Sequence, residues 1–294
     1  MRAAVLGATG TIGRALVQDL ARSHEVVAIS RSGSTPAEHR VTPVALDVAD
    51  RAALAAALED VEVVYHLVHS LGADDFEQRD RDAADSVAAA AGSAGARQIV
   101  YLGGLGDDAE SLSAHLRSRA ETAERLRRGT VPVTTLRAAM IVGPGSAAFE
   151  TIVALVERLP GMICPRWVSV PTQPVALDDV VRYLVEIGGL EEAYGEQFDV
   201  GGPDVMTYRE MMERIAGMLG RRPLIVEVPV LTPRLSSLWL HLVTPVQASV
   251  ARPLVEGMRS ATVVRDHRIR ALVPFEPTPF EVAVRSALTA RVAG

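Results

Sequence analysis

The sequence predicts an α/β fold in which a doubly wound parallel sheet is interlocked with a smaller C-terminal region. Short β-branched runs alternate with Ala- and Leu-rich helical stretches through the first half of the chain, which is the pattern of a parallel sheet covered by helices on both faces. A glycine-rich segment follows the first of these runs directly. After about residue 145 the alternation becomes irregular and prolines accumulate, which indicates a second region of different architecture.

The elements of the first half follow in chain order from these patterns. Each predicted strand is an apolar, β-branched run between turn residues, and the strands lie at Arg2–Leu6, Glu25–Ser30, Thr42–Leu46, Val61–Leu67, Gln98–Leu102 and Val133–Arg137. Each connecting helix carries apolar residues at helical spacing, and the helices cover Thr11–Arg22, Arg51–Leu58, Asp75–Ala91 and Ser113–Arg127.

The second half is expected to interlock with the first. Residues 1–145 form the sheet domain, and residues 173–202 contain a turn, helix and strand that can return to the main sheet. Residues 146–172 and 203–294 then make up the smaller second region. Its apolar stretch Leu235–Val250 is shorter than the roughly 18 to 20 residues of a membrane span. We interpret it as a core or lid helix, with contact to a membrane surface or another subunit as the alternative, so an oligomer is possible.

Composition excludes several classes of protein. All 30 basic residues are arginine, so chemistry that requires lysine, such as a Schiff base, a P-loop lysine or a Tyr-Lys pair, is impossible. A net charge of −6 gives no broad basic field for nucleic acid, so the expected partner is a small molecule. The single cysteine, Cys164, cannot form an internal disulfide, and the chain opens without a signal-peptide pattern. We therefore expect a cytoplasmic protein.

The strongest functional signal is the segment Gly7-Ala-Thr-Gly-Thr-Ile-Gly13, between the first strand and the first helix. Its glycines permit a tight turn, close approach of the backbone to a pyrophosphate and close contact between helix and strand. The helix N-terminus adds free N–H groups and the positive end of a dipole. The G-x-x-G-x-x-G spacing is a variant of G-x-G-x-x-G, and in this position it predicts a dinucleotide site in a Rossmann-type domain.

The end of the second strand indicates which dinucleotide binds. A site that selects NAD places Asp or Glu there to hold the ribose 2′-hydroxyl, whereas this chain continues as Ser30-Arg31-Ser32. Arg31 can pair with a 2′-phosphate, and Arg14 can close on the same group. The alternative for both arginines is an ordinary solvated side chain. On this pattern NADP(H) is favoured over NAD(H).

These features resemble the short-chain dehydrogenase/reductase superfamily, and the strand endings His66-Leu-Val-His-Ser70 and Tyr101-Leu-Gly-Gly-Leu-Gly106 add to the resemblance. The similarity is to its atypical branch, and within it to the NmrA-like and YbjT-like NAD(P)H-binding proteins, which are related to the 39 kDa accessory subunit of respiratory complex I. It is most specific over residues 1–145 and extends to Gln173–Val180 and Phe198–Pro203.

The residues and the resemblance together imply a set of cofactor contacts. Asp47, for example, is expected to hold the adenine amine, or else to cap the helix that follows it. The whole set comprises Gly7, Thr9, Gly10, Thr11, Ile12, Gly13, Arg14, Ser30, Arg31, Ser32, Asp47, Val48, Leu67, Val68, His69, Leu102, Gly103, Gly104, Arg119, Ala138, Ala139, Met140 and Ile141.

The catalytic residues depart from the family pattern. Active members of the superfamily commonly use a serine after the fifth strand and a Tyr-x-x-x-Lys motif on the next helix. Here the serine position falls in Gly103-Gly104, and the helical motif has His115 at the tyrosine position and Arg119 at the lysine position. His115 can donate a proton while Arg119 binds the nicotinamide ribose or stabilises negative charge. The alternative is that His115 only packs or caps and Arg119 only holds the cofactor.

Other candidate residues are weaker. His66 and His69 point to opposite faces of a strand, so no metal site is expected; His66 is interpreted as a buried histidine with a satisfied hydrogen bond. The second region is expected on the substrate side, where Met162, Trp167 and Trp239, with Leu235, Leu242 and Met258, can form an apolar pocket. Core packing is the alternative for these residues, and Tyr208 is interpreted as packing rather than as catalytic. The loop carboxylates Asp107 and Asp108 are interpreted as solvated.

The expected function is an NADP-dependent oxidoreductase that acts on a small apolar carbonyl, enone or quinone-like substrate. The missing Ser-Tyr-Lys set leaves a second hypothesis open, a non-catalytic redox sensor or scaffold that binds NADP(H). A third is non-redox isomerisation or cyclisation with a bound cofactor.

Overall fold

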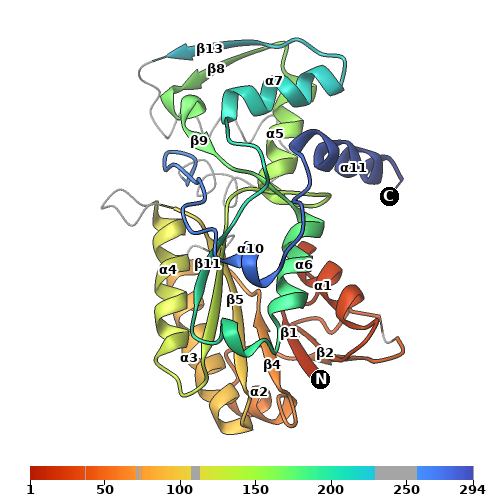
Figure 1. The fold of residues 1–294 in the computed structure, drawn as a ribbon, viewed down its shortest axis with the longest axis vertical. Helices are drawn as coiled ribbons and strands as arrows, with labels where there is room; N and C mark the ends of the chain where they lie inside the picture. Colours follow the sequence, from red (N-terminus) through yellow and green to blue (C-terminus); the bar gives the residue numbers. More distant parts are fainter. Residues whose placement is uncertain (37, 71–72, 74, 107–112, 229–256, 294) are drawn as a thin grey trace.

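A parallel sheet of seven strands, in the order β11-β6-β5-β4-β1-β2-β3, forms the centre of the molecule (Figure 1). The computed structural model describes residues 1–36, 38–70, 73, 75–106, 113–228 and 257–293. The strands of this sheet are β1 (Arg2–Leu6), β2 (Glu25–Ser30), β3 (Val41–Ala45), β4 (Val63–His66), β5 (Gln98–Gly104), β6 (Val133–Ala138) and β11 (Gln197–Val200). The predicted α/β class and parallel sheet are confirmed.

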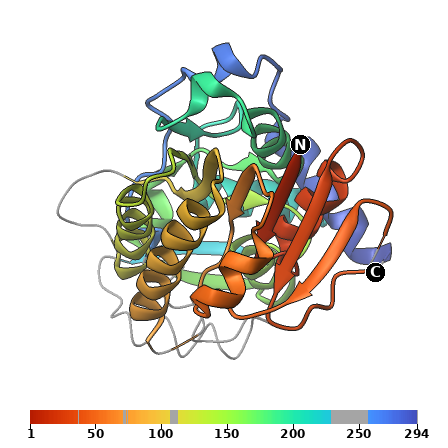
Figure 2. The same ribbon diagram turned by 90° about the horizontal axis from the view of Figure 1, so that it is seen from below.

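Helices cover both faces of this sheet, as the nearly continuous apolar strands require. On one face lie α2 (Arg51–Ala57), α3 (Phe76–Ala94) and α4 (Ala114–Arg127), and on the other α1 (Thr11–Leu20) packs beside α6 (Leu177–Ile187) (Figure 2). Each face has its own apolar core, with Leu54, Val87 and Leu126 on the first side and Leu16, Val180 and Leu184 on the second.

The second region has a separate core around α5 (Ala147–Arg158), α7 (Tyr208–Met218) and α11 (Phe280–Ala293). Three two-stranded sheets belong to it or join it to the main sheet. They pair β7 (Ile141–Val142) with β10 (Val175–Ala176), β8 (Gly161–Pro165) with β13 (Leu224–Val228), and β9 (Pro171–Thr172) with β12 (Met206–Thr207). The other short elements of the described residues are η1 (Arg166–Ser169), η2 (Glu191–Ala193) and α10 (Ile269–Leu272).

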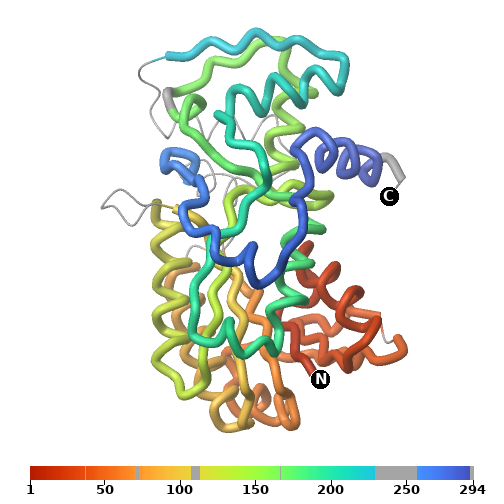
Figure 3. The backbone as a smooth tube through the Cα atoms, in the orientation of Figure 1, coloured from red at the N-terminus to blue at the C-terminus, as the bar shows by residue number. Residues whose placement is uncertain are grey.

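The chain passes between the two regions more than once, which Figure 3 shows in the green-to-blue half of the tube. After α5 and β8 it returns to the main sheet through α6 and β11, and β11 pairs in parallel with β6. Buried Gln98 on β5 ties this return in place. Its amide donates to Thr134 Oγ1 at 2.7 Å and accepts from the N–H of Gly189 at 2.7 Å.

Element boundaries differ from prediction by a few residues. The fifth strand continues to Gly104 rather than ending at Leu102, and the helix predicted to end at Ala91 continues to Ala94. Gly95 ends this helix because its φ of 72° lies in the left-handed region that favours glycine. In the part of the chain that the structure describes, no helix is both long and apolar enough to cross a bilayer. The stretch Leu235–Val250 and residues Asp107 and Asp108 lie outside the described residues.

Candidate functional site

The glycine loop connects the carboxyl end of β1 to α1. Gly7 has a φ of +89°, and a Cβ on it would lie 3.2 Å from the carbonyl oxygen of Leu67, which follows β4. A Cβ on Gly13 would lie only 2.2 Å from the carbonyl oxygen of Gly7. Glycine at these positions therefore lets helix, turn and neighbouring strand come closer than any side chain would allow.

A cavity of about 470 Å³ opens beside this loop, above the carboxyl ends of the strands. The sheet order reverses between β1 and β4, and ligands of open α/β sheets bind at such a switch point. The cavity walls come from the loops after β1, β4, β5 and β6. They include Gly7, Gly10, Thr11, Ile12, Gly13, Leu67, His69, Leu102, Gly103, Gly104, His115, Arg119, Ala138, Ala139, Met140 and Ile141.

Two helix N-termini meet at this cavity. Neither α1, which begins after Gly10, nor α5, which begins after Ser146, has a side-chain cap on its first N–H groups. Thr11 Oγ1 donates to the carbonyl oxygen of Gly145 at 2.9 Å and ties the two starts together. Both positive dipole ends therefore face one space, an arrangement that suits the paired phosphates of a dinucleotide.

Arg119 is the cation at the inner end of the cavity. Its guanidinium donates to the carbonyl oxygen of Leu102 and lies over the ring of Tyr101, 5.0 Å from the centroid. The Tyr101 hydroxyl donates back to the Arg119 carbonyl oxygen at 3.1 Å. These contacts hold the guanidinium of Arg119 against the end of β5.

His115, one turn before Arg119, also lines the cavity. Burial, with the positive charge of Arg119 and the nearby His69, lowers the pKa of His115 to about 3. The imidazole is therefore neutral at physiological pH, where it donates one hydrogen bond and accepts another but carries no excess proton. Its expected role as a proton donor accordingly requires a relay through the neutral ring rather than release from an imidazolium.

The two histidines of the β4 ending have different surroundings. His66 is buried, stacks on Tyr101 and has its pKa lowered to about 3, chiefly by burial. Its Nδ1 has no hydrogen-bond partner among the described residues, so the expected hydrogen bond is not found at this nitrogen. His69 faces the cavity, where its side chain is accessible although protein surrounds most of it. Burial and then the charge of Arg119 lower its pKa to about 4.

A buried carboxylate supports this wall from behind. Asp80 of α3 accepts the N–H of Ser70 at 2.8 Å and the hydroxyl of Ser118 at 3.2 Å. These bonds join the loop after β4 to both α3 and α4. Burial raises the pKa of Asp80 despite these donors and the charge of Arg119. The carboxylate thus holds Ser70 and Ser118, the chain neighbours of His69 and Arg119, and does not line the cavity itself.

The comparison with known families decides what this site belongs to. A family model described as NAD(P)H-binding matches residues 7–155, which include the glycine loop and all the strand ends around the cavity. The chain belongs to this NAD(P)H-binding family. The glycine cradle and the two uncapped helix N-termini fit a nicotinamide dinucleotide.

Two curated relatives extend the comparison to the second region. A mitochondrial protein of Arabidopsis thaliana, NADH dehydrogenase (ubiquinone) 1 alpha subcomplex subunit 9, is 26% identical over 243 residues, 77% of this chain and 60% of the relative. The (4-alkanoyl-5-oxo-2,5-dihydrofuran-3-yl)methyl phosphate reductase of Streptomyces griseus is 28% identical over 225 residues, 74% of this chain and 73% of the relative. The chain thus spans only part of the first relative.

Solved structures share the fold at low identity. A nucleoside-diphosphate-sugar epimerase from Staphylococcus aureus superposes with a TM-score of 0.77 at 15% identity, covering 97% of this chain and all of that one. The family match confirms the expected NAD(P)H-binding family, and the complex I relative and this shared fold agree with the resemblance that the sequence indicated.

The residues expected to select the cofactor do not line the described cavity. Arg31 is exposed on the turn after β2. Arg14 is also exposed, and its Nε donates to the carbonyl oxygen of Thr9 at 2.8 Å, which anchors it to the loop. Asp47 accepts the N–H of Ala49 at 3.0 Å. The cap of α2 is instead Asp50, so the alternative that Asp47 caps this helix was wrong.

Two of the residues expected in the substrate pocket pack elsewhere. Met162 is buried in the core of the second region, and Trp167 packs edge-on against Tyr208 with ring centroids 5.9 Å apart. Neither side chain lines the described cavity. Their surroundings therefore agree with the alternative, core packing. Met258 does line it, and Trp239 lies outside the described residues.

The second region contributes residues to the cavity that sequence reasoning did not select. Tyr208, interpreted from the sequence as packing, lines the cavity while remaining 4% exposed. The others are Ser146, Ala147, Ala148, Gly257 and Thr262, with Leu105, Leu116 and Gly145 from the first region. The turn Gly143-Pro-Gly-Ser146 before a helical stretch was the one signal that could have found the α5 start.

Proposed function

We propose that the protein is an NADP(H)-dependent oxidoreductase that acts on a small apolar carbonyl, enone or quinone-like compound. The observation that carries the proposal is one continuous cavity that runs from the glycine loop to His115 and Arg119. Its inner walls are largely apolar, with Leu105, Leu116 and Met140 among them. An apolar wall suits a substrate of the same character.

The chain's own residues have distinct parts in the proposed reaction. When bound, the nicotinamide exchanges a hydride with the substrate carbon. The N–H groups at the starts of α1 and α5 bind the phosphates. Arg119 stabilises negative charge that develops on the substrate oxygen. The neutral ring of His115 hydrogen-bonds the same oxygen and passes it a proton taken from water, so that ketone plus hydride plus proton gives alcohol.

Cofactor preference is proposed from the end of β2. No carboxylate follows Ser30, and exposed Arg31 and Arg14 lie on the turn after β2 and at the start of α1. Guanidinium groups bind phosphate through paired, charge-assisted hydrogen bonds, so a 2′-phosphate gains contacts that a 2′-hydroxyl lacks. We also propose that the protein is NmrA-like and works in the cytoplasm, which suits its single cysteine, Cys164, buried and unpaired.

Calorimetric titration with NADPH and NADH tests the cofactor proposal. We expect NADPH to bind at least about tenfold tighter, a difference of roughly 1.4 kcal/mol, and Arg31→Gln to remove most of that preference. Arg22→Gln is the matched control because Arg22 lies beyond the far end of α1 and pairs with Asp19. Equal affinity for both dinucleotides, or an equal effect of the two variants, would contradict the preference for NADP(H).

Turnover tests the catalytic proposal. NADPH oxidation over a panel of carbonyls, enones and quinones is expected to reveal a substrate, and His115→Phe is expected to lower kcat while dinucleotide affinity is retained. Unchanged kcat in this variant would exclude His115 from proton transfer.

A second candidate function rests on the departure of the expected catalytic residues from the family pattern. Gly103-Gly104 and His115 stand where active members carry serine and tyrosine, and one relative is named as a subunit of a larger complex. A non-catalytic redox sensor or scaffold needs only the binding half of the site. It requires different partner affinity with NADPH and NADP⁺ bound, because a ligand shifts an equilibrium only by differential affinity. Absence of turnover on the whole panel with such a difference would favour this function.

A further inference from the structure

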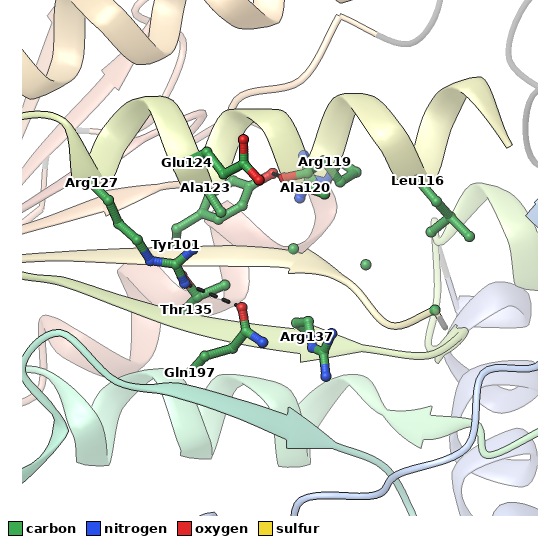
Figure 4. Close-up of a pocket in the computed structure, with 13 residues that line it drawn as sticks. Tyr101, Leu116, Arg119, Ala120, Ala123, Glu124, Arg127, Thr135, Arg137 and Gln197 are labelled. Carbon is green, nitrogen blue, oxygen red and sulfur yellow. Dashed lines mark hydrogen bonds between the residues drawn. The ribbon is translucent and has the colours of Figure 1, made fainter. Parts of the chain in front are cut away.

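A second, smaller pocket of about 130 Å³ lies between α4 and the strands β5, β6 and β11 (Figure 4). It shares Gly103, Gly104, Leu116 and Arg119 with the main cavity. A Cβ on Gly104 would lie 2.8 Å from Leu116 Cδ2, so the absence of a side chain there keeps this part of the pocket open. The pocket is thus a side chamber of the candidate active site.

The chamber is positively charged. Arg119 and Arg127 of α4 and Arg137 of β6 line it, against one carboxylate, that of Glu124. Figure 4 shows Arg127 reaching from α4 toward Thr135 of β6 and Gln197 of β11, with Arg119 farther along the same helix. Three guanidinium groups and one carboxylate leave an excess of positive charge on the lining.

Two of these arginines are bound only by uncharged groups in the part of the chain that the structure describes. Arg127 donates to Thr135 Oγ1 at 2.9 Å and to Gln197 Oε1 at 3.2 Å, and Arg119 donates to a backbone carbonyl. Arg137 differs because it pairs with buried Asp199 at 2.8 Å. Burial and, to a smaller extent, the charge of Arg137 lower the pKa of Arg127 against the opposing charge of Glu124.

We propose that this chamber binds the phosphate group of a phosphorylated substrate, with Arg127 as its main ligand. Two orientable guanidinium groups and the Thr135 hydroxyl supply the donors that a tetrahedral oxyanion accepts. The chamber holds a compact anion, and its shared wall at Gly103 and Gly104 lets the remainder of such a substrate continue into the main cavity. The substrate assignment rests on the proposed function, whereas the anion site does not.

The test measures binding of inorganic phosphate and of phenyl phosphate to the full chain by calorimetry, with no dinucleotide present. We expect saturable binding of both, tighter for phenyl phosphate because its ring can enter the apolar cavity. Arg127→Gln is expected to weaken both by about tenfold or more, as the loss of a charge-assisted hydrogen bond does. Because Arg127 is exposed at the helix end, this variant should fold normally.

Arg128→Gln is the matched control. It removes the same charge from the adjacent exposed residue, which does not line the chamber, and should leave both affinities within about twofold of wild type. Equal weakening in the two variants would mean diffuse surface attraction and would overturn the proposal. Binding that Arg127→Gln leaves unchanged would place phosphate at the glycine loop and would also overturn it.

The substrate assignment has its own outcome. If inorganic phosphate binds as tightly as phenyl phosphate and both depend on Arg127, the anion site stands but its link to a substrate is wrong. None of these measurements uses turnover or dinucleotide binding, so failure of the proposed oxidoreductase function would leave their result unaffected.

Discussion

At the residue scale, the glycine loop is the feature whose chemistry follows most directly from its geometry. Gly7 and Gly13 face backbone atoms, not flexible side chains, so the surroundings cannot move aside to accommodate a methyl group. The contrast is with Gly217 on α7, where a Cβ would meet nothing within 4 Å. A substitution to alanine is therefore expected to clash with the backbone at Gly7 and Gly13 and to be accommodated at Gly217.

Gly13→Ala is expected to weaken dinucleotide binding at least about tenfold, because the new methyl would lie 2.2 Å from the Gly7 carbonyl oxygen and force the loop open. Calorimetric titration with NADPH measures the loss. Gly217→Ala is the control, which should bind as wild type and gain less than about 1 kcal/mol in stability, because Gly217 lies in the last turn of α7. Undiminished affinity in Gly13→Ala would show that the loop does not hold the cofactor.

At the element scale, α7 is, together with α5, a helix that brings the second region to the cavity. Its N-cap, Thr207, accepts the N–H of Glu210 at 3.1 Å, and Glu210 accepts the N–H of Thr207 at 2.7 Å, a complete capping box. Tyr208 follows directly and lines the cavity. The cap therefore stabilises the helix and holds the backbone of a wall residue.

Thr207→Ala is expected to lower the free energy of unfolding by about 1 kcal/mol, the usual cost of losing an N-cap hydroxyl. Urea unfolding measures it. Thr289→Ala on α11 is the control, because this exposed hydroxyl only donates to the carbonyl oxygen of Arg285 within its own helix and should change stability by less than about 0.5 kcal/mol. Equal losses in the two variants would argue against a special role for the cap.

At the scale of the whole molecule, two polar networks join the regions across the sheet. Asp199 of β11, 1% exposed, accepts from Arg137 on β6 at 2.8 Å and from the backbone N–H groups of Arg265 and Asp266. Gln98 donates to the carbonyl oxygen of Ile187 at 3.2 Å and accepts the N–H of Gly189 at 2.7 Å, which fixes the turn after α6. Buried polar groups must find partners, so these two residues hold the returning chain in one register.

Acid is expected to destabilise the folded molecule through His66, at the centre of the sheet. Its pKa is about 3 in the folded protein against an ordinary 6.5. Between these values the unfolded chain binds a proton that the folded protein does not. The free energy of unfolding therefore decreases as the pH is lowered, by up to about 1.4 kcal/mol per pH unit. Above about pH 6.5 the contribution is constant, because the ring is neutral in both states.

Urea unfolding of wild type and His66→Phe at about pH 7.5 and about pH 5 checks this linkage. Phenylalanine retains a ring that can stack on Tyr101 but cannot bind a proton. We expect the variant to lose less stability than wild type over this interval. Equal losses would show that His66 is not the group whose protonation opposes folding.

Much of the fold and the cofactor half of the site could be predicted from the sequence. Alternating β-branched and helical runs specify a parallel sheet because each run is local, and the loop from Gly7 to Gly13 specifies a phosphate-binding turn because its spacing is local too. The absence of lysine by itself excludes the usual proton relay, because that relay requires an ammonium group beside the tyrosine.

Only the tertiary structure decided which distant residues complete the cavity and what charge they carry. Thr11 meets Gly145 across 134 residues of chain, and Tyr208 and Met258 arrive from the second region. The neutral state of His115 follows from its burial beside Arg119, and the charged side chamber follows from the spacing of α4 over β6. Such properties depend on desolvation and through-space charge, which the order of residues alone does not specify.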